Sequence, residues 1–168
     1  MAAKEVRRYT YLRTGKLLNF EHDLKKGDQA IVVGTHDAVA IRELTELRAP
    51  KGGFFIKSID LKYGKVILIS GDTEVSTLYA AYRFAEHLGC RFYLHGDVIP
   101  DQKIDLTLIN FDEQGQPTTK NGRQWQKRGI QPFQNFPAGS VMWGAEDWKM
   151  HIAQLPKMGM NFIGLHTY

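Results

Sequence analysis

Two pairs of neighbouring carboxylates are the residues best suited to acid–base chemistry. They are Asp112-Glu113 and Glu146-Asp147. Hydrolysis by two carboxyl groups requires them to face one another about 5–10 Å apart. Neighbours on a strand point to opposite faces of the sheet, and acidic residues at the start of a helix suit its positive end. Neither pair therefore makes a convincing acid–base couple, and we expect no hydrolysis by these residues alone.

Histidine and cysteine could supply a metal site or a nucleophile. The histidines are His22, His36, His87, His95, His151 and His166. None has HExxH or HxH spacing and there is one cysteine, so we expect no metal ion and no cofactor. Cys90 and His87 could pair as thiol and base. Three residues apart at a predicted helix end, they are better explained by capping and core packing.

The run Gly71-Asp72-Thr73 stands between an apolar segment and a helical one, a position that phosphate-binding loops also occupy. The sequence contains neither GxGxxG nor GxxxxGK[ST], the patterns that such loops use. Capping of the following helix by Asp72 or Thr73 is therefore the favoured interpretation.

Several aromatic side chains could form a platform for stacking sugars. They are Tyr79, Tyr82, Phe84, Phe92 and Tyr93. Their helical and strand spacing favours a place in the core instead.

Composition excludes some classes of protein. The 168 residues are 43% hydrophobic and 24% charged, which predicts a folded domain with a real core. The net charge of +4 is scattered, whereas a nucleic-acid binder concentrates its basic residues, so we expect no nucleic-acid partner. No apolar stretch approaches the ~20 residues of a membrane span, and no export signal is visible at the start.

Hydrophobic periodicity predicts an α/β (α+β) fold, a mixed sheet with helices packed on it. Predicted helices cover residues 3–13, 38–47, 74–88 and 146–158, and predicted strands cover residues 30–34, 54–61, 65–70, 90–94, 105–111, 128–133 and 161–165. A strand remains the alternative for the first helix, because Tyr9-Thr10-Tyr11 has β propensity. Pro156 should distort the last turn of the fourth helix.

The polar segment 112–121 is the best candidate for a boundary or a surface hairpin. Beyond it come one strand, one helix and one strand. Parallel strands need neighbours on both edges, so we expect this unit to be the severed beginning of a larger structure. Ile163 and Leu165 should then form an exposed apolar patch that favours self-association.

Two stretches resemble the start of known glycoside hydrolases. Residues 66–73, 78–82 and 88–92 resemble the ancillary α/β domain, sometimes called zincin-like although it binds no zinc, of bacterial family 20 β-hexosaminidases and family 67 α-glucuronidases. That domain usually has a strand before its first helix, which is missing here. Arg128-Gly129-Ile130, residues 148–158 and 161–166 are similar to the opening of the family 20 (β/α)8 barrel. Here Gln131-Pro132-Phe133 replaces the Asp that family 20 has after its Arg-Gly.

The resemblance implies an ancillary domain over residues 1–115 and a truncated barrel over residues 123–168. The parent enzyme would hydrolyse glycosidic bonds of an oligosaccharide or polysaccharide, with its catalytic acids outside this chain. Arg128 matches a sugar-binding arginine, and His166 and Tyr168 would close the second barrel strand, where side chains face the cleft. The alternative is a free-standing carbohydrate- or protein-binding module without catalysis. The compartment stays open, and a parent of this type would be periplasmic, on the outer surface or secreted.

Overall fold

The fold is seen in a computed structural model that describes residues 1–21, 29–61, 64–115, 125–132 and 140–165. The chain divides into two compact units. Unit 1 comprises Met1–Cys90 and Ile99–Pro117, and unit 2 comprises Arg91–Val98 and Thr118–Tyr168. Within the described ranges, no helix is long and apolar enough to serve as a membrane span.

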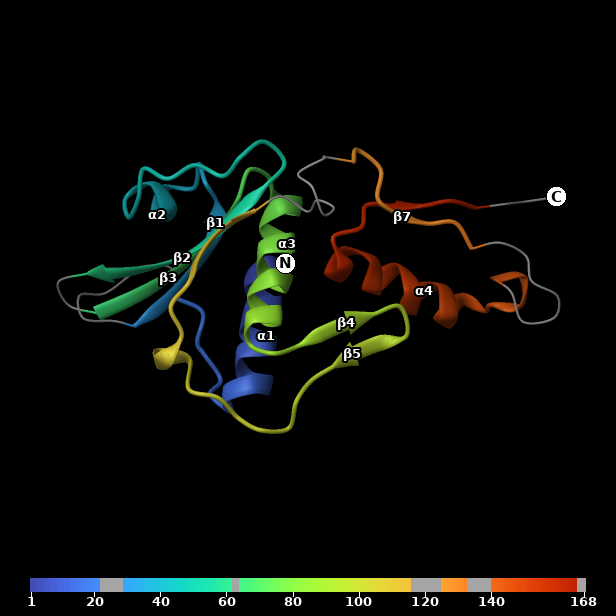
Figure 1. Ribbon diagram of the computed structural model, residues 1–168, viewed down its shortest axis with the longest axis horizontal. Coiled ribbons are helices and arrows are strands. Elements are labelled where there is room, and N and C mark those ends of the chain that lie inside the picture. Colours follow the sequence, from blue (N-terminus) through green and yellow to red (C-terminus); the bar gives the residue numbers. More distant parts are fainter. Residues whose placement is uncertain (22–28, 62–63, 116–124, 133–139, 166–168) are drawn as a thin grey trace. The chain divides into compact units, whose positions relative to one another are not determined.

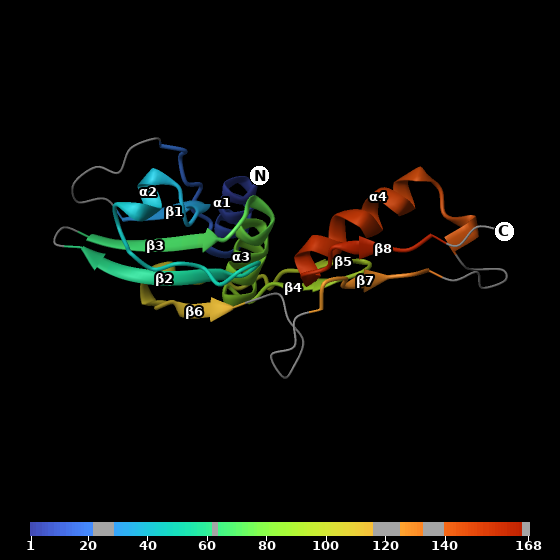
Figure 2. The same ribbon diagram turned by 90° about the horizontal axis from the view of Figure 1, so that it is seen from above.

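Unit 1 is built on a four-stranded mixed sheet, as predicted. Its strands are β1 (Ala30–Thr35), β2 (Phe54–Leu61), β3 (Gly64–Gly71) and β6 (Asp112–Gly115), in the order β1-β3-β2-β6 (Figure 2). Strand β1 runs parallel to β3, whereas β2 is antiparallel to both β3 and β6. The parallel pair brings the carboxyl ends of β1 and β3 together.

Helices cover both faces of this sheet. On one face α1 (Ala2–Thr14) and α3 (Glu74–His87) pack over Ile67 and Ile69, while on the other α2 (Val39–Arg42) packs over Val66 and Leu68 (Figure 1). Successive side chains of a strand point to opposite faces, so the uninterrupted apolar run of β3 feeds two cores at once.

The two long helices begin and end as the sequence predicts. Thr73 caps α3 by accepting a hydrogen bond from the Ser76 amide, and Gly89 follows the helix at a φ of 92°. Residues 2–14 form α1, which Gly15 ends at a φ of 76°, so the predicted helix is confirmed and the strand alternative is wrong. Val75, in the first turn of α3, is 57% exposed, whereas its neighbours Ser76 and Thr77 are buried.

Two predicted elements were wrong. The predicted helix 38–47 is a single turn, because the Thr45 hydroxyl accepts the Leu47 amide and offers the backbone a non-helical partner. The predicted strand 105–111 contains a 3₁₀ turn instead, η1 (Leu106–Leu108), which the Asp105 carboxylate caps at Thr107. Pairing with β2 begins only at Asp112, inside the segment predicted as a boundary.

Unit 2 contains a hairpin and a strand–helix–strand segment. The hairpin is β4 (Arg91–Tyr93) and β5 (Gly96–Val98), and the segment is β7 (Gly129–Ile130), η2 (Ser140–Met142), α4 (Ala145–Gln154), η3 (Leu155–Met158) and β8 (Phe162–Ile163). Strands β7 and β8 pair in parallel over two residues each, shorter than predicted. The predicted distortion at Pro156 is confirmed, since α4 tightens there into η3.

Candidate functional site

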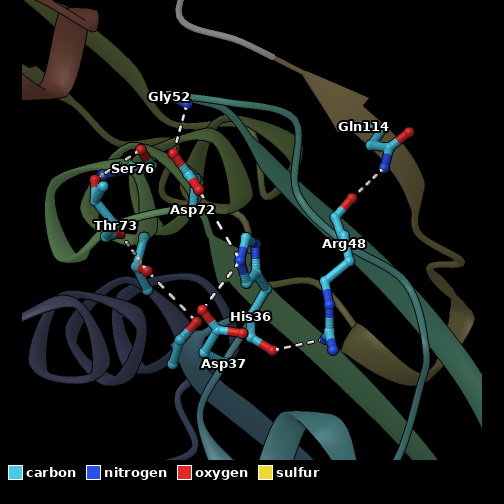
Figure 3. A network of polar contacts seen from close by, with 10 residues as sticks. His36, Asp37, Arg48, Gly52, Asp72, Thr73, Ser76 and Gln114 are labelled. Carbon is cyan, nitrogen blue, oxygen red and sulfur yellow. Dashed lines mark hydrogen bonds and ion pairs between the residues drawn. The ribbon is translucent and has the colours of Figure 1, made fainter.

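The carboxyl ends of β1 and β3 hold the polar network drawn in Figure 3. His36 directly follows β1 and Asp72 directly follows β3. The Nε2 atom of His36 lies 3.4 Å from Asp37 Oδ2 and 3.9 Å from Asp72 Oδ1. Sequence analysis gave no reason to join His36 to these carboxylates, because the parallel pairing of β1 with β3 creates the contact.

The same network fastens a loop to the sheet. Asp72 Oδ2 accepts the Gly52 amide at 2.8 Å, and the Asp72 amide donates to the Gly53 carbonyl at 3.0 Å. Arg48 donates to the His36 carbonyl, and Gln114 of β6 donates to the Arg48 carbonyl. Of the two capping candidates, Thr73 is the cap and Asp72 is the loop anchor.

Nucleophilic catalysis does not fit this arrangement. Two hydroxyls of the network, those of Thr73 and Ser76, share a 2.9 Å hydrogen bond with each other. The Nδ1 atom of His36 is buried and has no hydrogen-bond partner among the residues that the structure describes. A His–Asp couple needs a nucleophile within reach of the second ring nitrogen. We therefore interpret the network as structural: it holds the loops at the carboxyl ends of β1 and β3.

The two carboxylate pairs are also occupied by other contacts. Asp112 pairs with Lys57 at 3.1 Å and Glu146 with Lys149 at 2.7 Å. Asp147 Oδ2 accepts the Gly144 amide at the start of α4. Each of these carboxylates therefore has a structural partner.

Glu113 belongs to a charged cluster that joins β6 to α3. Arg83 Nε donates to both oxygens of Glu113, at 2.9 and 3.1 Å, and Arg83 Nη1 donates to Glu86. Partial burial lowers the pKa of Arg83, but the hydrogen bonds to Glu86 and Glu113 outweigh it, and the net pKa is raised. His87 Nε2 also contacts Glu113, and Cys90 is buried.

The predicted sugar-binding residue Arg128 lies at the amino end of β7. Its Nε donates to the Gly159 carbonyl at 2.8 Å and its Nη1 to the Trp125 carbonyl at 2.6 Å. Its main chain exchanges two further bonds with Asn161, which precedes β8. These contacts hold β7 against β8. The other two predicted residues, His166 and Tyr168, lie outside the described residues.

Most of the aromatic candidates belong to the core, as predicted. Tyr79, Tyr82, Phe84 and Phe92 are buried, whereas Tyr93 is exposed and stacks on His95. Sequence reasoning missed a second aromatic cluster, in which Trp143 stacks on His151 at 4.1 Å and meets Trp148 edge-on. The spacing of Trp148 and His151, three residues apart on one helix, was the available signal. No group of three metal-ligating side chains occurs in the described ranges.

Fold and site together define a class, a mixed α/β domain whose polar network fastens loops to the sheet. Residues 1–84 match the family described as the glycosyl hydrolase family 67 N-terminus. The match covers half of the 168 residues, and the chain belongs to this family. It therefore carries an ancillary domain of a glycoside hydrolase, as the resemblance implied. No curated protein matches the chain.

Proposed function

We propose that unit 1 is the accessory domain of an enzyme that hydrolyses glycosidic bonds of an oligosaccharide or polysaccharide, and that β7, α4 and β8 open its catalytic barrel. The observation that carries the proposal is the family 67 N-terminal match over residues 1–84. The proposal includes the likeness of residues 128–166 to the family 20 barrel. It also includes a bacterial origin of the parent enzyme.

The strand–helix–strand segment supports the barrel part of the proposal. Two parallel strands joined through a helix are the repeating element of a (β/α)8 barrel. Of the two residues predicted to form an exposed patch, Leu165 just after β8 is 68% exposed, whereas Ile163 is half-buried; Phe162 is the exposed residue within the strand. Strands of a parallel sheet are normally covered on both faces, so these apolar side chains suit further barrel elements as neighbours.

In this proposal His166 and Tyr168 contact the sugar, since they follow β8 at its carboxyl end, where barrel enzymes place their sites. Arg128, by contrast, lies at the amino end of β7, so a sugar contact has to reach from there and to accommodate the bonds that its guanidinium already donates to Gly159 and Trp125. A guanidinium offers five N–H donors in a rigid fork, so one side chain can serve both tasks.

The test compares two polypeptides on the same panel of aryl glycosides and of neutral and acidic oligosaccharides, with released sugar as the readout. The complete protein should release sugar, and residues 1–168 alone should not. Turnover by residues 1–168 that disappears in Glu146→Gln or Asp147→Asn would contradict the proposal. So would a complete protein that binds these sugars without cleaving any of them.

A further inference from the structure

The β4–β5 hairpin belongs to unit 2, although it is inserted in sequence between two stretches of unit 1. Residues on both sides of it, Cys90 and Ile99, belong to unit 1, whereas the hairpin itself, Arg91–Val98, belongs to unit 2. Its two ends are held by different chemistry, and each end is built around one buried cation.

At its base the hairpin is held by Arg13 of α1. This side chain lies in unit 1 at 4% exposure. Its Nε donates to the Leu88 carbonyl at 2.6 Å, on the chain entering the hairpin. Its Nη1 donates to the carbonyls of Pro100 and Gln102, on the chain leaving it. One guanidinium therefore ties together the two segments that flank the hairpin.

Within unit 2 the hairpin is held by an ion pair. Lys157 Nζ of η3 donates to both carboxylate oxygens of Asp97, at 2.7 and 3.0 Å. The side chains are only 8% and 9% exposed, and the ammonium also lies 5.8 Å from the centre of the Phe92 ring. Removing one partner of such a pair leaves an uncompensated buried charge, which is strongly destabilising.

Lys157 lies just before the turn that connects η3 to β8 in unit 2. Two residues later the Gly159 carbonyl accepts a hydrogen bond from the Arg128 guanidinium, and the Asn161 amide donates one to the Arg128 carbonyl. The ion pair thus holds the turn from which β8 starts and to which β7 is bonded.

We propose that the β4–β5 hairpin is a strap: it is rooted in unit 1 at Arg13 and holds the η3–β8 turn of unit 2 through Asp97 and Lys157. The covalent connection through the hairpin then couples the strand–helix–strand segment to the base that Arg13 holds. This inference is independent of whether the complete protein cleaves sugars, and its test involves no substrate.

Amide hydrogen exchange on the 168-residue chain tests the strap. The reporters in unit 2 are the amides of Asn161, Gly164 and Met160, which donate to carbonyls within that unit, and those in unit 1 are the amides of β3. Lys157→Met should lower the unit 2 protection roughly 100-fold, and the double variant Asp97→Leu/Lys157→Met should recover most of it. Lys149→Met, which removes an ammonium at a 72% exposed position of α4, is the matched control and should stay within about twofold.

Arg13→Lys distinguishes a strap from a purely local ion pair. Lysine cannot reproduce the forked contacts, so buried carbonyls lose their donors. Protection in unit 2 should fall about tenfold while β3 stays protected, since the loosened base no longer restrains the hairpin. If Arg13→Lys also exposes β3, a two-glycine insertion between Cys90 and Arg91 replaces it, with the same expectation.

Three results would overturn the inference. The first is unit 2 protection that stays within about twofold in Lys157→Met. The second is unchanged unit 2 protection when the base is loosened and β3 is intact. The third is a lack of measurable unit 2 protection in the unaltered chain.

Discussion

Units 1 and 2 are stabilised in different ways. Unit 1 buries apolar side chains on both faces of its sheet, including Phe55, Leu68 and Ile69 at 0% exposure. Among the described residues of unit 2, only Phe92 and Leu155 are buried apolar side chains. Burial of a large apolar side chain contributes about 1.5–3 kcal/mol to the free energy of unfolding. Apolar burial therefore contributes much more to the stability of unit 1 than to that of the described part of unit 2.

Polar contacts take the place of a core in unit 2. The Asp97–Lys157 pair, the Arg128 bonds and the stacked Trp143 and His151 rings connect its elements. Such contacts depend on geometry, whereas apolar burial is non-directional. We therefore expect unit 2 to be destabilised by small changes of geometry, and unit 1 mainly by loss of apolar volume.

The largest expected effect is in unit 1. Phe55→Ala should lower the free energy of unfolding by about 3–5 kcal/mol, because the ring is fully buried and a cavity would remain. Urea unfolding measures it. Val75→Ala, at an exposed position of α3, should change stability by no more than about 0.5 kcal/mol. Equal losses of stability in the two variants would contradict the conclusion that apolar burial stabilises unit 1.

The next effect sharpens the description of unit 2. A Cβ at position 129 would overlap the Phe162 carbonyl oxygen, so Gly129→Ala should weaken the β7–β8 pair by about 1–3 kcal/mol. Exchange of the Asn161 amide measures the loss, and β3 should be unaffected. Gly164→Ala is the control, since its new methyl group would meet the Gln131 side chain, which can move.

A smaller effect concerns the edge of unit 1. Glu113→Gln removes the charge that Arg83 binds with two hydrogen bonds, and should cost about 0.5–1 kcal/mol because both side chains are partly exposed. The neighbouring variant Asp112→Asn, which removes a more exposed pair with Lys57, should cost less. Thermal unfolding of both variants decides. A larger loss in Asp112→Asn would show that the cluster does not fasten β6.

The smallest effect is a pH dependence. The Thr107 amide holds the pKa of Asp105 below its ordinary value. Because the folded pKa lies below the unfolded one, the stabilisation is present above about pH 4 and is lost as the pH falls through the folded pKa. NMR titration of the carboxyl should show the lowered midpoint, and Asp105→Asn should remove this part of the acid sensitivity. A midpoint at or above the ordinary value would contradict it.

Sequence periodicity sufficed where local and long-range preferences agree. The helix after Thr73 has a cap, an apolar face and a terminal glycine, and its bounds were predicted to within a residue. It failed where one side chain redirects the backbone, at Thr45 and at Asp105. Such local hydrogen bonds are invisible to an apolar pattern.

The contacts that hold the β4–β5 hairpin were harder to predict, because their partners are distant in sequence. Asp97 and Lys157 are 60 residues apart, and Arg13 meets its carbonyls 75 to 89 residues away. Each of these charged residues would ordinarily be placed at the surface. The ancillary domain of a glycoside hydrolase, by contrast, could be predicted from residues 66–92, because short motifs in order carry the resemblance; these motifs did not decide between families 20 and 67.

Gly129 has a consequence for how the two shortest strands find each other. A ladder of two residues offers few hydrogen bonds to fix its alignment, and a slip by one residue would exchange the faces of the strand that moves. Sliding either way would bring Arg128 or Ile130, each with a Cβ, to the place where the Phe162 carbonyl leaves room only for hydrogen. The glycine thus disfavours a slip of this ladder by one residue in either direction.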